Sequence, residues 1–203
     1  MAELDSPNMT PKLITFLSSL LQRIAESNDL NPEFQPQKTS AFHGLVRSNI
    51  SIHSYLQRIF KYANCSPSCY VVAYVYLDRF TKRQPELQIN SYNIHRLLIT
   101  SVMVSAKFMD DRYYNNAYYA KIGGISTTEI NFLEVDLLFG LGFHLNVSPS
   151  TFHAYCSHLH RQITILHYIP KLSFTEDQPS FCTGKSVNIQ DESAHQKQHQ
   201  LTV

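Results

Sequence analysis

The sequence of 203 residues has no tryptophan, only six glycines and four cysteines, and almost balanced charge, with a net charge of +1. This balance removes the simplest argument for binding nucleic acid, because no basic excess is present to neutralise a run of phosphates. The few cysteines, and a start that lacks the basic and apolar regions of a secretory leader, indicate a reduced compartment. We therefore expect an intracellular protein of the nucleus, the cytoplasm or both.

Long apolar runs are also missing. The most apolar stretches, "CYVVAYVYL" and "LLITSVMVSA", are much shorter than the roughly 20 residues that a membrane helix needs. The few glycines form no phosphate-binding loop, and no nucleophile elbow or Ser/His/Asp arrangement with a defined spacing is present. We expect a chain that is not an enzyme, uses no cofactor and does not enter a membrane.

Helix signals dominate what is present. Apolar residues recur at helical spacing over 13–24 and 52–63. The run "CYVVAYVYLDRF" and residues 91–110 are apolar on nearly every side, which is typical of helices that neighbours surround. Residues 126–129 match a capping box at the start of "INFLEVDLLFGL", and Ser148 with the proline after it begins a last helix. The sequence predicts an all-α bundle.

Three charged residues lie inside apolar helical runs: Lys107, Glu134 and Asp78. Burying any of them alone costs several kcal/mol, so each needs a partner. In one interpretation they mark the solvent-facing edges of ordinary amphipathic helices. In the other, Lys107 and Glu134 emerge beside each other on one surface and bind the backbone of another protein. Spacing alone does not choose between these two interpretations.

Metal and acid–base chemistry have weak candidates. His153, Cys156 and His160 fall on one helical face, but a fourth ligand is not apparent and we predict no metal site. Cys65 and Cys69 form a C-x3-C pair without a matching second pair, so we interpret them as structural thiols. Asp110 and Asp111 are adjacent, so on a helix their side chains would point roughly 100° apart. They fit a helix end and a loop contact better than a catalytic pair.

Three runs of the sequence resemble the cyclins, and most closely the plant U-type (P-type) cyclins, which are similar to the phosphate-response cyclins of yeast. They read "ISIHSYLQRIFKYANCSPSCYVVAYVYLDRF", "LLITSVMVSAKFMDDRYYNNAYYAKIGGIS" and "EINFLEVDLLFGLGFHLNV". The resemblance implies a five-helix cyclin box that forms a heterodimer with a cyclin-dependent kinase and holds the kinase's C-helix in its active position. The domain boundaries that follow are an N-terminal helical extension (1–30), a linker (31–49), a single cyclin box (50–147), a C-terminal extra helix (148–167) and a disordered tail (168–203).

The resemblance also assigns residues. Lys107 and Glu134 occupy the positions of the lysine and glutamate that hold the kinase in this family. The segment after Lys107 would lie beside that contact, which adds to the kinase-binding set Phe108, Asp110, Asp111, Tyr113 and Tyr114. Asp78 would form a structural ion pair with Arg58. The first box helix reads "ISIHSYLQRI" in place of the apolar-basic docking motif of mitotic cyclins, so we do not expect substrate recruitment through that groove.

The leading hypothesis is therefore a regulatory subunit that binds and activates a cyclin-dependent kinase in the control of cell division, or in phosphate signalling as in yeast. The alternative is a cyclin-fold adaptor in transcription that binds no kinase. The alternative needs a basic face, for which the sequence offers Arg58, Lys61, Arg79, Lys82 and Arg83. A metal or redox enzyme is the third hypothesis.

Overall fold

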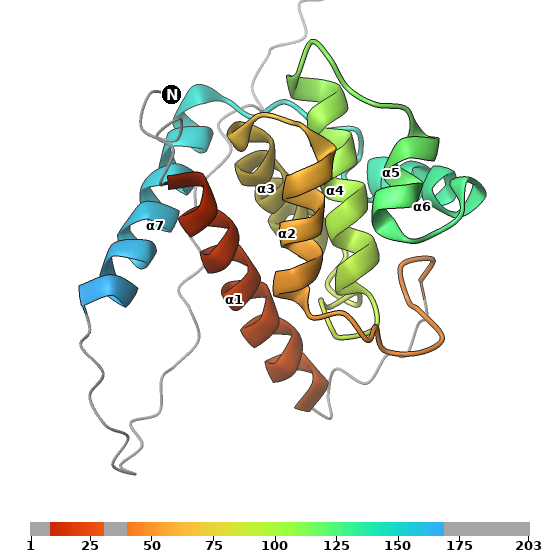
Figure 1. The fold of residues 1–203 in the computed structure, drawn as a ribbon, viewed down its shortest axis with the longest axis horizontal. Helices are drawn as coiled ribbons and strands as arrows, with labels where there is room; N and C mark the ends of the chain where they lie inside the picture. Colours follow the sequence, from red (N-terminus) through yellow and green to blue (C-terminus); the bar gives the residue numbers. More distant parts are fainter. Residues whose placement is uncertain (1–8, 31–39, 169–203) are drawn as a thin grey trace, which may run out of the picture. The chain divides into compact units, whose positions relative to one another are not determined.

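The computed structural model describes residues 9–30 and 40–168, and all the regular secondary structure in these ranges is α-helix (Figure 1). The prediction of an all-α fold is confirmed for the described residues. The helices of the described ranges are α1 (Met9–Leu30), α2 (Ile52–Ala63), α3 (Pro67–Arg83), α4 (Ile94–Met109), α5 (Asn116–Gly123), α6 (Thr127–Gly140) and α7 (Pro149–Tyr168).

Several predicted segments lie outside the described residues. They are the first eight residues of the N-terminal extension, the first part of the linker (31–39) and the tail from residue 169 onwards. Across the described ranges, no helix combines the length and the apolar character needed to cross a membrane.

Helix α4 is the centre of the bundle, because it contacts α2, α3, α5 and α6. Figure 1 shows it running between α2 and α3 on one side and the α5–α6 pair on the other. Every residue of α4 from Leu97 to Ala106 is buried, as its unbroken apolar sequence predicts. The hydroxyls of Thr100 and Ser105 donate to backbone carbonyl oxygens, whereas the buried hydroxyl of Ser101 has no hydrogen-bond partner among the described residues. Ser105, for example, donates to the carbonyl oxygen of Cys69 on α3 at 2.9 Å.

The capping box at the start of α6 forms only in part. The Ser126 hydroxyl accepts the backbone N–H of Glu129 at 3.0 Å, as the sequence predicts. The Glu129 carboxylate, however, accepts from Nε of Arg96 on α4 at 2.7 Å. A charge-assisted bond to a guanidinium is stronger than one to a neutral backbone N–H, so the carboxylate joins α6 to α4 and does not return to Ser126.

Helices α1 and α7 contact each other, α1 contacts α2, and α7 contacts α3. Leu13, Leu17 and Leu21 of α1 are buried in the same core as Leu159 of α7. The far end of α1 is fixed to the segment before α4, because the Asp29 carboxylate accepts the backbone N–H and the hydroxyl of Ser91. Among the described residues, this packing leaves one side of α6 and the last residues of α4 without a helical neighbour, and those two elements form the site described next.

Candidate functional site

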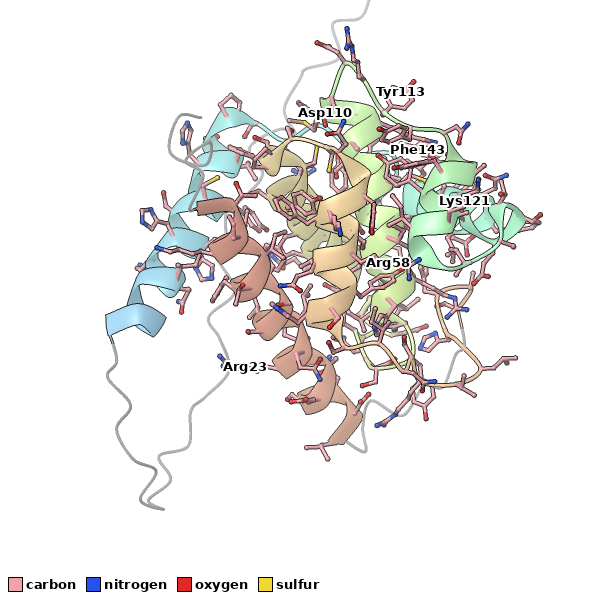
Figure 2. All side chains as sticks on the ribbon, viewed as in Figure 1. Arg23, Arg58, Asp110, Tyr113, Lys121 and Phe143 are labelled. Atoms are coloured by element: carbon pink, nitrogen blue, oxygen red, sulfur yellow. The ribbon has the colours of Figure 1, made fainter. Side chains whose placement is uncertain are left out.

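Helix α4 ends where its side chains leave the core. Lys107 is half-buried, whereas Phe108 and Met109 are exposed. Asp110 then leaves the helical conformation, and its carboxylate accepts both the backbone N–H and the hydroxyl of Ser66, at 2.9 and 2.7 Å. Ser66 is the N-cap of α3, so the Asp110 side chain ties the end of α4 to the beginning of α3 (Figure 2).

Lys107 and Glu134 lie side by side, on α4 and α6. The ammonium Nζ is 2.6 Å from Oε1 of the carboxylate, and the two side chains keep 26% and 19% of their surface exposed. The other carboxylate oxygen accepts from Nδ2 of Asn116, at the start of α5, at 2.7 Å. One glutamate therefore joins three helices. The lysine has three donors and uses one of them here, so its remaining N–H groups can reach a partner's carbonyl oxygens.

An apolar stripe covers the outer side of α6. Phe132, Val135 and Phe139 are spaced three and four residues apart, which places them on one helical face, and Phe143 follows after the helix ends. Between 49% and 68% of each of these four side chains is exposed. We call this set, Phe132, Val135, Phe139 and Phe143, the outer face of α6. A contiguous group of exposed aromatic and branched side chains is typical of an interaction surface.

The chain after α6 holds the last member of this face in place. Gly142 and Phe143 both have left-handed backbone conformations, with φ of 58° and 59°. A phenylalanine rarely adopts this conformation, and it persists only where the surroundings impose it. Here Arg79 of α3 donates to the carbonyl oxygens of His144 and Asn146, and Tyr76 donates to that of Leu145. The Phe143 ring consequently lies 5.2 Å from that of Phe139, edge to face.

The predicted contact residues in the segment after α4 differ in their surroundings. Asp111 is exposed, and so is Tyr113, with 56% of its surface accessible (Figure 2). Tyr114 instead stacks on Tyr118 of α5, with ring centroids 3.9 Å apart. The Tyr118 hydroxyl donates to the carbonyl oxygen of Tyr62. Tyr114 therefore packs one face on its own chain and still keeps 39% of its surface exposed, so both tyrosines are accessible to a partner.

Comparison with known proteins places these features in a family. The family model described as Cyclin matches residues 12–145. The chain is 63% identical to Cyclin-U4-1 of Arabidopsis thaliana over 202 residues, and these residues cover 98% of each of the two chains. It is 54% identical over 165 residues to Cyclin-P4-1 of Oryza sativa subsp. japonica, which covers 79% of this chain and 78% of that one. The chain belongs to the cyclin family.

Cyclins are regulatory and not catalytic subunits, and membership of the family implies a role in regulating cyclin-dependent kinases in the cell cycle. The predicted resemblance to plant U-type and P-type cyclins is confirmed. Cyclin-U4-2 of Arabidopsis thaliana is a further relative, 54% identical over 191 residues, which cover 93% of this chain and 88% of that one. The family match begins at residue 12, so it covers α1 except its first three residues.

One predicted contact of this cyclin is wrong. Asp78 does not pair with Arg58. Its carboxylate binds Lys82, one turn further along α3, at 2.8 Å, and accepts from the Tyr155 hydroxyl on α7. Arg58 lies on α2 and donates to the carbonyl oxygen of Lys121 on α5 at 2.9 Å (Figure 2). The two side chains face different neighbours, because Asp78 lies on the side of α3 that meets α7.

The exposed apolar face of α6 was missed from sequence. In "INFLEVDLLFGLGF" every turn of α6 carries apolar residues, and that pattern usually indicates a helix buried on all sides. Only Ile130, Leu133, Leu137 and Gly140 of α6 are buried in the structure. The sequence of α6 holds more apolar residues than one buried stripe needs, and this excess could have indicated a second, exposed apolar face. Sequence alone does not show that the second stripe is left uncovered by the other described helices.

Metal ligands are not assembled in the described part of this cyclin. Within residues 9–30 and 40–168, no three histidine, cysteine or acidic side chains gather in a way that would hold a metal ion. His153, Cys156 and His160 lie along α7.

Proposed function

We propose that this cyclin binds a cyclin-dependent kinase through the end of α4 and the outer face of α6, and activates it. The single observation that carries the proposal is the Lys107–Glu134 pair, at 2.6 Å, beside exposed aromatic side chains on the same two helices. Apolar surface supplies the favourable free energy of association, and the lysine supplies directed donors at its edge. The family's kinase-holding lysine and glutamate correspond to these two residues.

Activation follows from preference for one state of the kinase. A kinase whose C-helix moves between two orientations is shifted towards the active one by any subunit that binds that orientation more tightly. The outer face of α6 and Phe108 form a surface fixed by Tyr76 and Arg79 on one side and by Asp110 on the other. A preorganised surface loses little conformational entropy on binding, so it favours a single orientation of its partner. The kinase supplies ATP, magnesium and the catalytic groups.

The test measures affinity for the partner kinase in Lys107→Ala and Glu134→Ala. Each change removes a partly exposed ion pair, so we expect it to lower the free energy of unfolding by only about 1–2 kcal/mol. We expect binding to the kinase to weaken at least tenfold, about 1.4 kcal/mol, because the directed contacts at the edge are lost. Lys12→Ala, at an exposed lysine on α1, is the matched control and should bind like the wild type.

Unchanged affinity in both variants, with folded chains shown by circular dichroism, would contradict the proposal. Loss of binding in Lys12→Ala as well would show that the effect is not specific to this surface.

The adaptor hypothesis gains no support from the basic residues it needs. Arg79 binds two backbone carbonyl oxygens, Lys82 binds Asp78, and Arg58 binds the carbonyl oxygen of Lys121. Side chains held within their own chain are less available to phosphates. A gel shift with nucleic acid at physiological salt checks this alternative, and a shift at micromolar protein would revive it.

A further inference from the structure

Helix α6 has three acidic side chains, and one of them has no partner among the described residues. Glu129 is paired with Arg96 on α4. Glu134 is paired with Lys107 on the same neighbouring helix. Asp136 is exposed, and no hydrogen bond or ion pair joins it to another described residue. Within the described ranges, the negative charge of Asp136 is therefore uncompensated.

Asp136 lies across the outer face of α6 from the Lys107–Glu134 pair. Successive residues of an α-helix are turned by about 100° around its axis. Counted around the axis from Glu134, the three outer-face residues within the helix lie at about 100° to 160°, and Asp136 lies at about 200°. The apolar stripe therefore has a charged group at each edge. Lys107, with N–H groups left to donate, marks one edge, and the carboxylate of Asp136 marks the other.

A partner that covers this face removes water from the Asp136 carboxylate. An ionised carboxylate that loses its water without gaining a cation is strongly unfavourable. A lysine or an arginine on the partner compensates the charge, and arginine does so best because its planar guanidinium can bind both carboxylate oxygens. Asp136 therefore discriminates between partner surfaces that fit the apolar side chains equally well.

We propose that Asp136 is a specificity-determining residue of the kinase-binding surface, and that it selects a kinase whose docked C-helix carries an arginine or a lysine opposite it. The proposal rests on the proposed function and names the chemistry of the partner at that site. With donors at one edge and an acceptor at the other, the surface also fixes the direction of the docked helix. The reversed direction would place the partner's cation beside Lys107 and leave Asp136 unpaired.

A second copy of this chain fits the same face less well. A dimer with two-fold symmetry centred on the outer face of α6 would bring two Asp136 carboxylates to the same contact. Like charges brought together in an interface repel each other and weaken it. A wild-type dimer in analytical ultracentrifugation that Phe139→Ser dissociates would show that a second copy covers this face, and would overturn the proposal.

The first experiment measures affinity for the kinase that the wild-type chain binds, by titration calorimetry. Asp136→Asn keeps the size of the side chain and removes its charge, and we expect it to weaken binding about fivefold or more. Asp136→Lys reverses the charge and should weaken binding further. Glu26→Gln, at an exposed carboxylate of α1, is the matched control and should bind like the wild type. All three variants should unfold in urea like the wild type, because Asp136 makes no bond that folding needs.

The salt dependence of binding separates the charge of Asp136 from its shape. Raising the ionic strength screens an ion pair at the edge of an interface. The affinity of the wild-type chain should therefore fall more steeply with salt than that of Asp136→Asn. Equal slopes for the two chains would overturn the pairing of Asp136 with a cation.

A charge reversal on the kinase identifies that cation. Each arginine and lysine of the C-helix is changed to glutamate in turn and is tested against the wild-type chain and Asp136→Lys. We expect one kinase variant to bind the wild-type chain poorly and to restore binding of Asp136→Lys, which is the coupling expected of two side chains in contact. If no kinase variant restores binding, the proposed partner of Asp136 is wrong.

The outcomes separate this proposal from the proposed function. A wild-type chain that binds no kinase contradicts both. A wild-type chain that binds a kinase, with Asp136→Asn and Asp136→Lys binding equally well, overturns only the role of Asp136 and leaves the kinase-binding surface in place.

Discussion

At the scale of single residues, the neighbouring aspartates Asp110 and Asp111 make different contacts. Asp110 accepts two hydrogen bonds from Ser66, whereas Asp111, next to it, is exposed. The sequence predicts a helix end and a loop contact for this pair, and the structure adds that only the first carboxylate makes the contact. The Asp110 side chain reaches the start of α3, whereas the Asp111 side chain faces solvent.

Replacing Asp110 by alanine should therefore lower stability. The change removes both bonds to the N-cap of α3, which are charge-assisted, and we expect the free energy of unfolding to fall by about 2 kcal/mol. Urea denaturation followed by circular dichroism measures it. Asp111→Ala is the matched control and should stay within about 0.5 kcal/mol of the wild type. Equal effects of the two substitutions would show that the Ser66 contact contributes little.

The histidines before and within α4 make stability depend on pH. Burial lowers the pKa of His43 and of His95 below the ordinary value of 6.5. A group whose pKa is lowered by folding binds a proton more readily in the unfolded chain. Stability should thus be fully present above about pH 6.5 and should decrease as the pH falls from there towards the lowered values.

Urea midpoints measured between pH about 7.5 and about 5.5 check this dependence. The double variant His43→Gln with His95→Gln should flatten the curve, and His153→Gln, at an exposed histidine of α7, should leave it unchanged. A midpoint that rises on acidification would mean that these histidines are stabilised in their charged form.

At the scale of elements, α6 has two apolar faces with separate roles. Leu137 faces the core and Phe139 faces outwards, with 68% of its side chain exposed. Leu137→Ala should cost about 2–5 kcal/mol of folding free energy. Phe139→Ser should change stability by about 0.5 kcal/mol or less, because a surface position loses little packing.

We expect Phe139→Ser to weaken kinase binding, as measured by titration calorimetry. A variant that binds normally would show that the outer face of α6 is not part of the interface.

The inner side of α6 also explains one glycine. A Cβ at Gly140 would lie 2.2 Å from Cε2 of Phe80 on α3, much closer than real Cβ contacts. Alanine usually stabilises a helix relative to glycine by about 0.5–1 kcal/mol, but overpacking of this kind costs about 1–3 kcal/mol. Gly140→Ala should therefore lower the melting temperature. The double variant with Phe80→Leu tests the cause, since coupling between the two sites should recover part of the loss.

At the scale of the whole molecule, the periodicity of apolar residues was sufficient to predict where the helices lie in the sequence. It was not sufficient to predict which side chains of different helices contact each other. The apolar stripe predicted α2, the apolar sequence on nearly every side predicted the buried α4, and the capping box predicted the start of α6. Local sequence determines where a helix can begin and which side is apolar. Contacts between elements were less predictable. Asp78 was assigned to Arg58 although Lys82 is one turn away, and Glu129 was assigned to its own cap although Arg96 lies opposite. Side-chain partners depend on the final arrangement of helices, which spacing does not specify.

The most direct test measures phosphate transfer by each cyclin-dependent kinase of the same cell, with and without the purified chain, and with Phe139→Ser and Lys107→Ala in parallel. We expect at least one kinase to be activated by the wild-type chain, and the same kinase to respond much less to either variant. If no kinase binds or responds to the folded wild-type chain, or if both variants activate as well as it does, the proposal that this surface regulates a kinase is contradicted.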